Sequence, residues 1–338
     1  MTASTEQELV TVVIPARNED CFIGACLDAV LAQTYENLQV IVVDGASDDR
    51  TQAIVKQRGV ADERVELLVN PRRLIPISLN LALAAARGVW LVRIDAHATV
   101  PPDYVGRCVE LLREGRWQGV GGRKDGVGVT PAGRAVAAAM ASRFGVGNST
   151  YHYGTSRQAV DHVPFGAYPV DTLRTLGGWE ESLAVNQDFE LDYRIREHGG
   201  TLLFDPGLVI HWHCRQTVPD LYRQYRRYGR GKTVVASLHP ASMRWRHLMA
   251  PALVAWLMAA LAIAPRRPRA AVLATVPYLA ALTAGTATTS RRLEEPAARL
   301  LVAPAFVAMH VGWGVGFWQG VVQLTVGRFR GTRPRRPS

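Results

Sequence analysis

Short runs of apolar, mostly β-branched residues recur through the first hundred positions of the chain. They fall at residues 9–14, 38–43, 65–69 and 89–94, and polar residues begin within three positions of the end of each run. Runs this short and this largely apolar predict strands that are buried on both faces, as in a parallel sheet. Segments with helical patterning separate them, at residues 19–33, 50–58 and 76–87. The alternation predicts an α/β domain with a mostly parallel, doubly wound sheet.

Polar side chains follow all four predicted strands. In an open α/β sheet the carboxyl ends of the strands share one edge, and ligands bind there. Capping of the next turn would explain one such residue, but it explains four successive polar ends less well. The residues predicted at this edge are Arg17, Asn18, Glu19, Asp44, Asp48, Asn70, Arg72, Arg73, Asp95 and His97.

Two common nucleotide-binding loops are missing from the sequence. No GxGxxG follows the first predicted strand, which argues against a dinucleotide, and no GxxxxGK[ST] occurs, which argues against a P-loop ATPase. A nucleotide diphosphate that is held by a metal ion stays open. Asp95 and His97 follow the fourth strand, and both residue types bind divalent cations. The alternative is that Asp95 caps a turn and His97 lies at the surface.

A second candidate group begins a predicted helix at residues 186–198, where Asp188, Glu190 and Asp192 occur. Acidic residues in a first helical turn are favoured by the helix dipole, which is the structural explanation. The functional explanation is a general base, because a carboxylate at a rigid helix end can take a proton from a hydroxyl. Helical spacing puts Asp188 and Asp192 on one face and Glu190 on another.

The middle of the chain has a weaker pattern. His211 and His213 lack the further ligands of a zinc site, so they are either structural or supply one extra ligand near Asp95. Helices are predicted at 101–114, 132–144 and 170–176, a strand and turn at 120–128, a long loop at 145–162, and two short strands at 202–206 and 208–212.

A basic amphipathic helix is predicted at about residues 218–230. Its arginines share one stripe, as fits a membrane interface or a diphosphate, although a solvated face would look the same. The stripe consists of Arg223, Arg226, Arg227 and Arg230.

Three uncharged segments follow, at residues 248–264, 270–289 and 300–326, and a basic tail at 328–338 ends the chain. The last two segments are long enough to span a bilayer, and the first is at the short limit. The net charge of +10 lies largely beside these segments, which points to anionic lipid headgroups. No nucleic-acid-binding motif accompanies it, so nucleic acid is not expected as a partner. We therefore expect two or three membrane helices, multi-pass or partly re-entrant.

These features together resemble the inverting glycosyltransferases of family 2, which have the GT-A fold. The resemblance covers residues 9–235 and is strongest to membrane-attached bacterial members that build exopolysaccharide, such as succinoglycan-type glucosyltransferases. It implies a GT-A domain at residues 1–235, which includes the amphipathic helix, and a membrane region at 248–327.

The resemblance also implies roles for individual residues. The metal motif falls on Asp95 and His97, with His in place of the second Asp, and the catalytic base falls on Asp188. Donor contacts fall on Pro15, Arg17, Asn18, Glu19, Asp44, Asp48, Arg73 and Asp95. Contacts to the acceptor or the diphosphate fall on Gly166, Trp179, Gln224, Arg227 and Tyr228, where Tyr228 replaces the family's Trp.

The expected activity is transfer of a sugar from a UDP-linked or other nucleotide-sugar donor to a lipid-linked saccharide, assisted by Mg²⁺ or Mn²⁺. The expected location is the cytoplasmic membrane, with the catalytic domain in the cytoplasm. Two alternatives stay open: a polyisoprenyl-phosphate glycosyltransferase, whose acceptor needs no base, and an inactive nucleotide-sugar-binding scaffold.

Overall fold

The computed structural model describes residues 7–329 of the chain, with side chains to residue 326. Contacts between residues divide the chain into two compact units. The first unit combines Met1–Asp125 with Gly154–Trp212, and the second combines Gly126–Tyr153 with His213–Ser338. Most of the predicted basic tail at residues 328–338 lies outside the described residues.

The first unit is built on a parallel core of four strands, in agreement with the sequence pattern. β1 pairs with β2 from Val10 opposite Leu38 to Ala16 opposite Asp44, and β4 pairs with β1 on its other side. The side chains of β1 and β2 are almost all buried, which explains why their sequences are mostly apolar. The strands are β1 (Val10–Ala16), β2 (Leu38–Asp44), β3 (Val65–Val69) and β4 (Trp90–Arg93).

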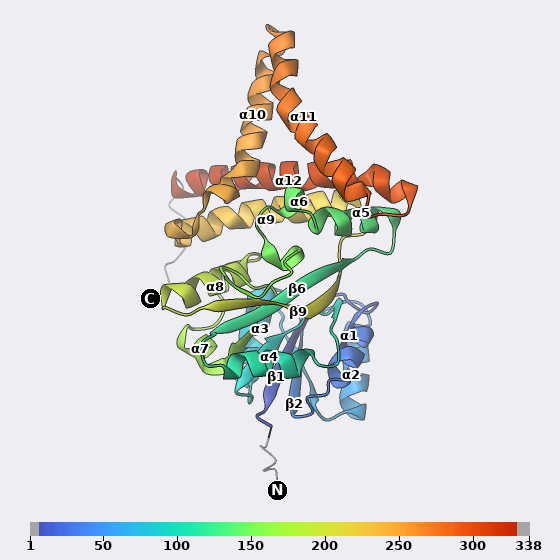
Figure 1. Ribbon diagram of the computed structural model, residues 1–338. Coiled ribbons are helices and arrows are strands. Elements are labelled where there is room, and N and C mark those ends of the chain that lie inside the picture. The colour runs from blue at the N-terminus through green and yellow to red at the C-terminus, as the bar shows by residue number, and fades with distance from the viewer. Residues whose placement is uncertain (1–6, 330–338) are drawn as a thin grey trace. The chain divides into compact units, whose positions relative to one another are not determined.

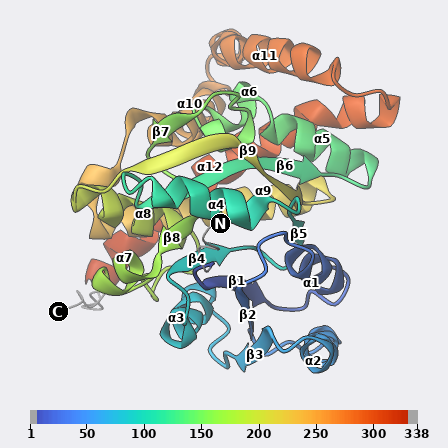
Figure 2. The same cartoon turned by 60° about the horizontal axis from the view of Figure 1, so that its bottom comes forward.

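Helices lie on both faces of this core. In Figure 2, α3 lies on one side of the four strands and α1 and α2 lie on the other. The helices are α1 (Ile23–Leu31), α2 (Thr51–Ala61), α3 (Ile75–Ala85) and α4 (Tyr104–Arg113). Helix α1 begins four residues later than predicted, because the backbone amide of Glu19 donates to Thr51 Oγ1 (2.8 Å) and that of Asp20 to Asp49 Oδ2 (3.1 Å).

The sheet continues in antiparallel fashion beyond β4, in the order β3-β2-β1-β4-β8-β6-β9-β5, with β7 paired to β9. The added strands are β5 (Ala98–Thr99), β6 (Gly119–Val127), β7 (Gln158–Val160), β8 (Ala167–Pro169) and β9 (Leu202–His213). Two expectations were wrong. Residues 202–206 and 208–212 form one continuous strand, β9, which runs through Pro206. Strand β7 lies inside the segment that was predicted as a loop. It is ordered by pairing with Leu202–Phe204 of β9, and a strand of three residues is too short to be recognised from its sequence pattern.

The remaining helices of the first unit frame the candidate site, and are α7 (Val170–Thr175) and α8 (Gln187–Glu197). The second unit is helical. It contains α5 (Pro131–Met140), α6 (Arg143–Val146), η1 (Thr150–His152), α9 (Val218–Leu238), η2 (Pro240–Ser242), η3 (Trp245–Leu248), α10 (Met249–Ile263), α11 (Pro268–Ser290) and α12 (Pro296–Phe329).

Three stretches of the second unit are long and apolar enough to cross a membrane, namely Trp245–Ile263, Pro268–Ser290 and Pro296–Val326. They correspond to the three predicted segments. Within this unit, α10 and α11 form a hairpin that projects from α9 and α12, which lie alongside each other (Figure 1). Most of the large side chains of α10 and α11 are exposed, as expected of helices surrounded by lipid.

Glycines bring α9 and α12 into backbone contact. A Cβ atom on Gly316 would lie 2.0 Å from the carbonyl oxygen of Arg226, and one on Gly229 would lie 2.0 Å from that of Trp313. Gly312 and Gly320 make similar approaches one turn to either side, against Tyr222 and Thr233. We call Gly229, Gly312, Gly316 and Gly320 the glycine seam. Small residues at four-residue spacing are how membrane helices pack closely.

We predict that Gly316→Ala destabilises the second unit by about 1–3 kcal/mol. The new methyl group would clash with the carbonyl oxygen of Arg226, which can move away only if helix α9 shifts with it. Thermal unfolding of the detergent-purified protein measures this. Gly24→Ala in α1 is the matched control, because a Cβ there meets nothing within 4 Å. That change should instead stabilise the protein by about 0.5–1 kcal/mol, the usual gain of Ala over Gly in a helix. Equal effects of both changes would contradict the seam.

Candidate functional site

Arg93, the last residue of β4, connects the two predicted catalytic regions. Its Nε and Nη2 donate to Asp95 Oδ1 (3.2 and 2.8 Å), and its Nη1 bonds both carboxylate oxygens of Asp188. Burial alone would lower the pKa of Arg93, but the carboxylates of Asp188 and Asp95 outweigh it and raise the pKa, so the guanidinium stays charged. Sequence reasoning missed Arg93, although a single charge within an apolar strand was a signal for it.

Asp188 is held at the N-terminal end of α8 by a second donor. Trp179 Nε1 lies 3.2 Å from Asp188 Oδ1, and the Trp179 ring is buried. The Gly177-Gly178 turn, with φ angles of 75° and 72°, orients this Trp, and Asn80 bonds both the amide and the carbonyl of Trp179 at 2.8 Å. Trp179, predicted as an acceptor contact, therefore supports Asp188 directly. The Asp188 side chain is still 19% exposed, so a substrate can reach it.

The other two acidic residues of α8 are engaged in the protein interior. Glu190 forms an ion pair with Arg194 (2.7 Å). Asp192 is fully buried and accepts hydrogen bonds from His162, from the amide of Val163 (2.8 Å) and from the Tyr168 hydroxyl (2.9 Å). Burial raises the pKa of Asp192, and the bond from His162 opposes that rise. Of the three acids, Asp188 alone is placed to meet a substrate.

His97 uses both of its ring nitrogens within the protein. Trp212 Nε1 donates to His97 Nε2 (2.7 Å), so the ring proton is on Nδ1, which donates to Glu19 Oε1 (3.0 Å). Trp212 was missed in the sequence. It lies on β9 between His211 and His213, whose side chains alternate to the opposite face of the strand. The structural interpretation of these two histidines is therefore favoured over an extra ligand near Asp95.

The fit of a divalent cation depends on Asp95. The described residues contain no group of three or more His, Cys, Asp or Glu side chains that could hold a metal. A cation bound through substrate phosphates needs only one or two carboxylates, since phosphate oxygens and water complete its shell. Asp95 meets this need, because its Oδ2 has no partner among the described residues and its side chain is 18% exposed. His97 could join only after its Nε2 is released from Trp212.

Strained backbone marks the loops around this site. Asn18, Ala46 and Arg73 follow β1, β2 and β3, and each has a φ angle between 52° and 61°. Phe165 and Asn186, which precede β8 and α8, have φ angles of 51° and 64°. These five are all the non-glycine residues with positive φ in the described part of the chain. Such conformations persist where the surrounding contacts fix them, and they concentrate at functional sites.

The predicted donor-binding residues lie in these strand-end loops. Arg17, Asn18, Asp48 and Arg73 are exposed, and Pro15 and Glu19 are partly buried. Asn18 joins two loops, since its amide donates to Ser47 Oγ (2.9 Å) and its Oδ1 accepts from the Asp48 amide (3.1 Å).

Asp44 differs from the other predicted donor contacts because it is fully buried. Its carboxylate accepts from the Ser47 amide (2.9 Å) and from Gln52 Nε2 (2.7 Å). In this arrangement Asp44 shapes the loop that presents Asp48. Its direct contact with a nucleotide stays a prediction.

Cationic and aromatic side chains lie on the β6 and β8 side of the site. Lys124 Nζ lies 3.7 Å from the centre of the Trp212 ring and 4.7 Å from that of Phe165. Arg93 lies over the same Phe165 ring at 5.5 Å. Gly166 is buried, and its carbonyl accepts from the Arg93 amide (3.2 Å), so this predicted acceptor contact orients β4.

The predicted Gln224, Arg227 and Tyr228 group lies on α9 in the second unit. Gln224 is buried and its Nε2 donates to the Tyr228 hydroxyl (2.8 Å), while Arg227 is exposed. These three residues, assigned through the family resemblance, thus form one hydrogen-bonded pair, Gln224 and Tyr228, with Arg227 on the same helix.

Comparison with known proteins agrees with this geometry. The sequence profile described as glycosyl transferase family 2 matches residues 11–167, and that of glycosyl transferase family group 2 matches residues 90–288. The chain is 31% identical to the succinoglycan biosynthesis protein ExoA of Rhizobium meliloti (strain 1021), over 93% of this chain and 95% of that protein.

A more distant relative is a Methanococcus voltae enzyme named dolichyl N-acetyl-alpha-D-glucosaminyl phosphate 3-beta-D-2,3-diacetamido-2,3-dideoxy-beta-D-glucuronosyltransferase. It is 24% identical over 66% of this chain and 72% of its own length. The fold is similar to that of a mannosyltransferase from Pyrobaculum calidifontis, solved in complex with GDP-Man and Mn²⁺, with a TM-score of 0.56 and 21% identity over 97% of this chain and 89% of that one. The chain belongs to glycosyltransferase family 2 and has the GT-A fold of that family, followed by three apolar helices that suggest membrane association.

Proposed function

We propose that this transferase moves a sugar from a nucleoside-diphosphate sugar, with UDP as the expected nucleotide, to a lipid-linked saccharide during exopolysaccharide or cell-surface glycan assembly. The observation that carries the proposal is the pairing of Asp95 and Asp188 through Arg93. One carboxylate follows the parallel strand β4, where a diphosphate would bind, and the other begins a helix and is open to an acceptor hydroxyl.

The proposed reaction is a single displacement with inversion. Asp188 takes the proton of the acceptor hydroxyl as its oxygen attacks the anomeric carbon, and the bond from that carbon to the diphosphate oxygen breaks. Arg93 and Trp179 fix the direction of the Asp188 carboxylate, which keeps it oriented before the acceptor arrives. The scheme requires no covalent intermediate on the protein.

Asp95 is the proposed ligand for Mg²⁺ or Mn²⁺, joined by His97 where Trp212 yields its hydrogen bond. When bound, such a cation supplies positive charge that stabilises the departing nucleoside diphosphate. Support comes from the partly exposed Asp95 side chain, whose Oδ2 has no partner among the described residues, and from the GDP-Man and Mn²⁺ present in the similar mannosyltransferase structure. The exposed loop residues Arg17, Asn18, Asp48 and Arg73 are proposed to bind the nucleotide part of the donor.

The acceptor and the location are proposed from the second unit and from the relatives. The name of the Methanococcus voltae enzyme gives a dolichyl-phosphate-linked sugar as its acceptor, and the Rhizobium meliloti protein is named for succinoglycan biosynthesis. Three apolar helices fit work at a membrane. We place the protein in the cytoplasmic membrane, with the catalytic domain facing the nucleotide sugars of the cytoplasm.

The test is release of a nucleoside diphosphate from a panel of nucleotide sugars by the detergent-purified full chain, with a bacterial lipid extract as acceptor source. We expect activity with Mg²⁺ or Mn²⁺ that EDTA abolishes. Asp95→Ala should lower it about 100-fold or more, consistent with the loss of several kcal/mol of charge stabilisation. Asp28→Ala is the control, because that carboxylate lies on α1 in an exposed pair with Arg58. Tight nucleotide binding without turnover in every condition would support the scaffold alternative.

A further inference from the structure

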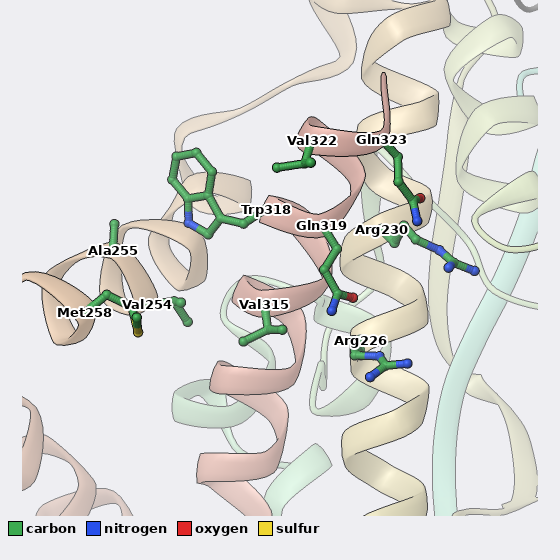
Figure 3. Close-up of a pocket in the computed structure, with 10 residues that line it drawn as sticks. All are labelled: Arg226, Arg230, Val254, Ala255, Met258, Val315, Trp318, Gln319, Val322 and Gln323. Carbon is green, nitrogen blue, oxygen red and sulfur yellow. The ribbon is translucent and has the colours of Figure 1, made fainter. Parts of the chain in front are cut away.

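An open cavity of about 740 Å³ lies among α9, α10 and α12 of the second unit. In Figure 3, α12 occupies the middle of this region, with Arg226 and Arg230 of α9 on one side of it and Val254, Ala255 and Met258 of α10 on the other. All three helices belong to one compact unit. The cavity therefore has a cationic side and an apolar side.

The cationic side carries two arginines, Arg226 and Arg230. Arg226 and Arg230 are exposed, and no carboxylate within the described residues pairs with either one. Arg223, one turn earlier on the same helix, is instead paired with Asp220 (3.1 Å). Residues four apart on a helix have Cβ atoms about 5–6 Å apart, so two guanidinium groups can act on one small anion. Guanidinium matches phosphate oxygens in geometry as well as in charge.

The apolar side is built from helices with the composition of membrane spans. Met258 is 60% exposed, and Trp318 of α12 is 42% exposed with its Nε1 bonded to the carbonyl of Pro251 (2.9 Å). This bond fixes the indole ring between α12 and α10. Val315 and Val322 extend the same surface along α12. Exposed apolar side chains of this kind offer a hydrocarbon chain a continuous wall.

The glycine seam keeps the two sides together. Gly316 approaches the carbonyl of Arg226, and Gly320 approaches that of Arg230. The backbone of each arginine is therefore in close contact with the helix that carries Trp318. The arginines cannot separate from the apolar wall unless α9 separates from α12.

We propose that this cavity binds a lipid diphosphate, with the diphosphate on Arg226 and Arg230 and the hydrocarbon chain against α10 and α12. A diphosphate linkage carries about two negative charges, whereas the phosphodiester of a common phospholipid carries one, so two unpaired guanidinium groups match the diphosphate. The inference deepens the proposed function, on which it rests, by naming the lipid part of the acceptor.

The experiment measures binding of farnesyl diphosphate to the detergent-purified full chain by isothermal titration. We expect Arg226→Gln and Arg230→Gln each to weaken binding about 10–100-fold, the usual effect of losing one charged hydrogen bond to phosphate. Arg223→Gln is the matched control on the same helix, and it should leave binding within about twofold. Ala255→Trp, at an exposed position, should weaken farnesyl diphosphate by filling the apolar side while leaving inorganic diphosphate unchanged.

Four outcomes would overturn the proposal. Equal losses in Arg223→Gln and Arg226→Gln would show attraction to general positive charge. If farnesol bound as tightly as farnesyl diphosphate, the arginines would not contribute to binding. If phosphatidylglycerol bound as tightly as farnesyl diphosphate, the cavity would be a general surface for anionic lipids. Nucleoside diphosphate release is measured on the same samples. Normal turnover with unaffected lipid binding in the arginine variants rejects this site alone, whereas lipid binding without turnover of any nucleotide sugar rejects the proposed activity alone.

Discussion

Asp188→Asn is expected to lower sugar transfer about 10²–10⁴-fold, the range that a positioned general base contributes. Asparagine keeps the size of the side chain and its bond from Trp179 Nε1, but it cannot accept the proton of an acceptor hydroxyl. Donor binding should be almost unchanged, because the strand-end loops are untouched. The measurement is transfer of labelled sugar to lipid extract, with nucleotide affinity determined on the same samples.

Glu190→Gln is the comparison for Asp188→Asn. Glu190 lies two residues further along α8 and is buried against Arg194, so its loss should affect stability more than the chemical step. Substantial transfer by Asp188→Asn would favour the alternative in which the acceptor is a lipid phosphate, which attacks without a base. Equal loss of transfer in both variants would point to disturbance of the helix.

Arg93→Met is expected to lower the stability of the first unit and to abolish transfer. Removing one partner from a buried ion pair costs about 3–5 kcal/mol, and because Asp95 and Asp188 are partly exposed we expect about 2–3 kcal/mol. The loss arises because two partly buried carboxylates, Asp95 and Asp188, then lie at one edge of the sheet without a cation between them. Denaturant unfolding and transfer assays measure the two effects.

Two further variants test why Arg93→Met loses stability and transfer: Arg87→Met is the surface control, and Arg93→Lys separates the charge of Arg93 from the shape of its guanidinium group. Arg87 pairs with Glu66 at the surface, where an ion pair contributes about 0–1 kcal/mol, so that variant should resemble the parent protein. Arg93→Lys retains the charge but lacks the planar group that reaches both carboxylates, so it should recover stability more than transfer. If Arg93→Met remains as stable and as active as Arg87→Met, Arg93 does not organise the site.

The sequence predicts the parallel half of the fold well because a buried parallel strand has a distinctive composition. β1 to β4 and the helices between them follow from apolar runs and polar ends alone. The antiparallel half was predicted less well. β7 is three residues long and is ordered by β9, and β9 continues through Pro206, where composition suggested a break. Long-range pairing decides such elements, and it leaves little trace in local composition.

The candidate site shows the same division. The sequence identifies Asp95 and Asp188 because each stands at the end of a predictable element. It cannot show that Arg93 joins them, because that contact links positions 95 residues apart. Trp212 lies between His211 and His213, and the sequence indicated a possible metal-binding role for those two histidines but no role for the tryptophan. Their alternation on β9 turns the tryptophan, rather than either histidine, toward His97.

The glycine seam has a consequence for shortened forms of this protein. A chain that ended before α10 would retain the catalytic unit and α9 but would lack Gly312, Gly316 and Gly320. The buried Leu221 and Tyr225 of α9, and the backbone around Gly229, would lose the helix that α9 packs against along its length. Removing the apolar helices would therefore not yield a soluble enzyme that is free of aggregation. It would expose an aggregation-prone apolar surface on α9, the last retained helix. Recombinant work on the catalytic unit therefore requires that α12 be kept or that this surface of α9 be redesigned.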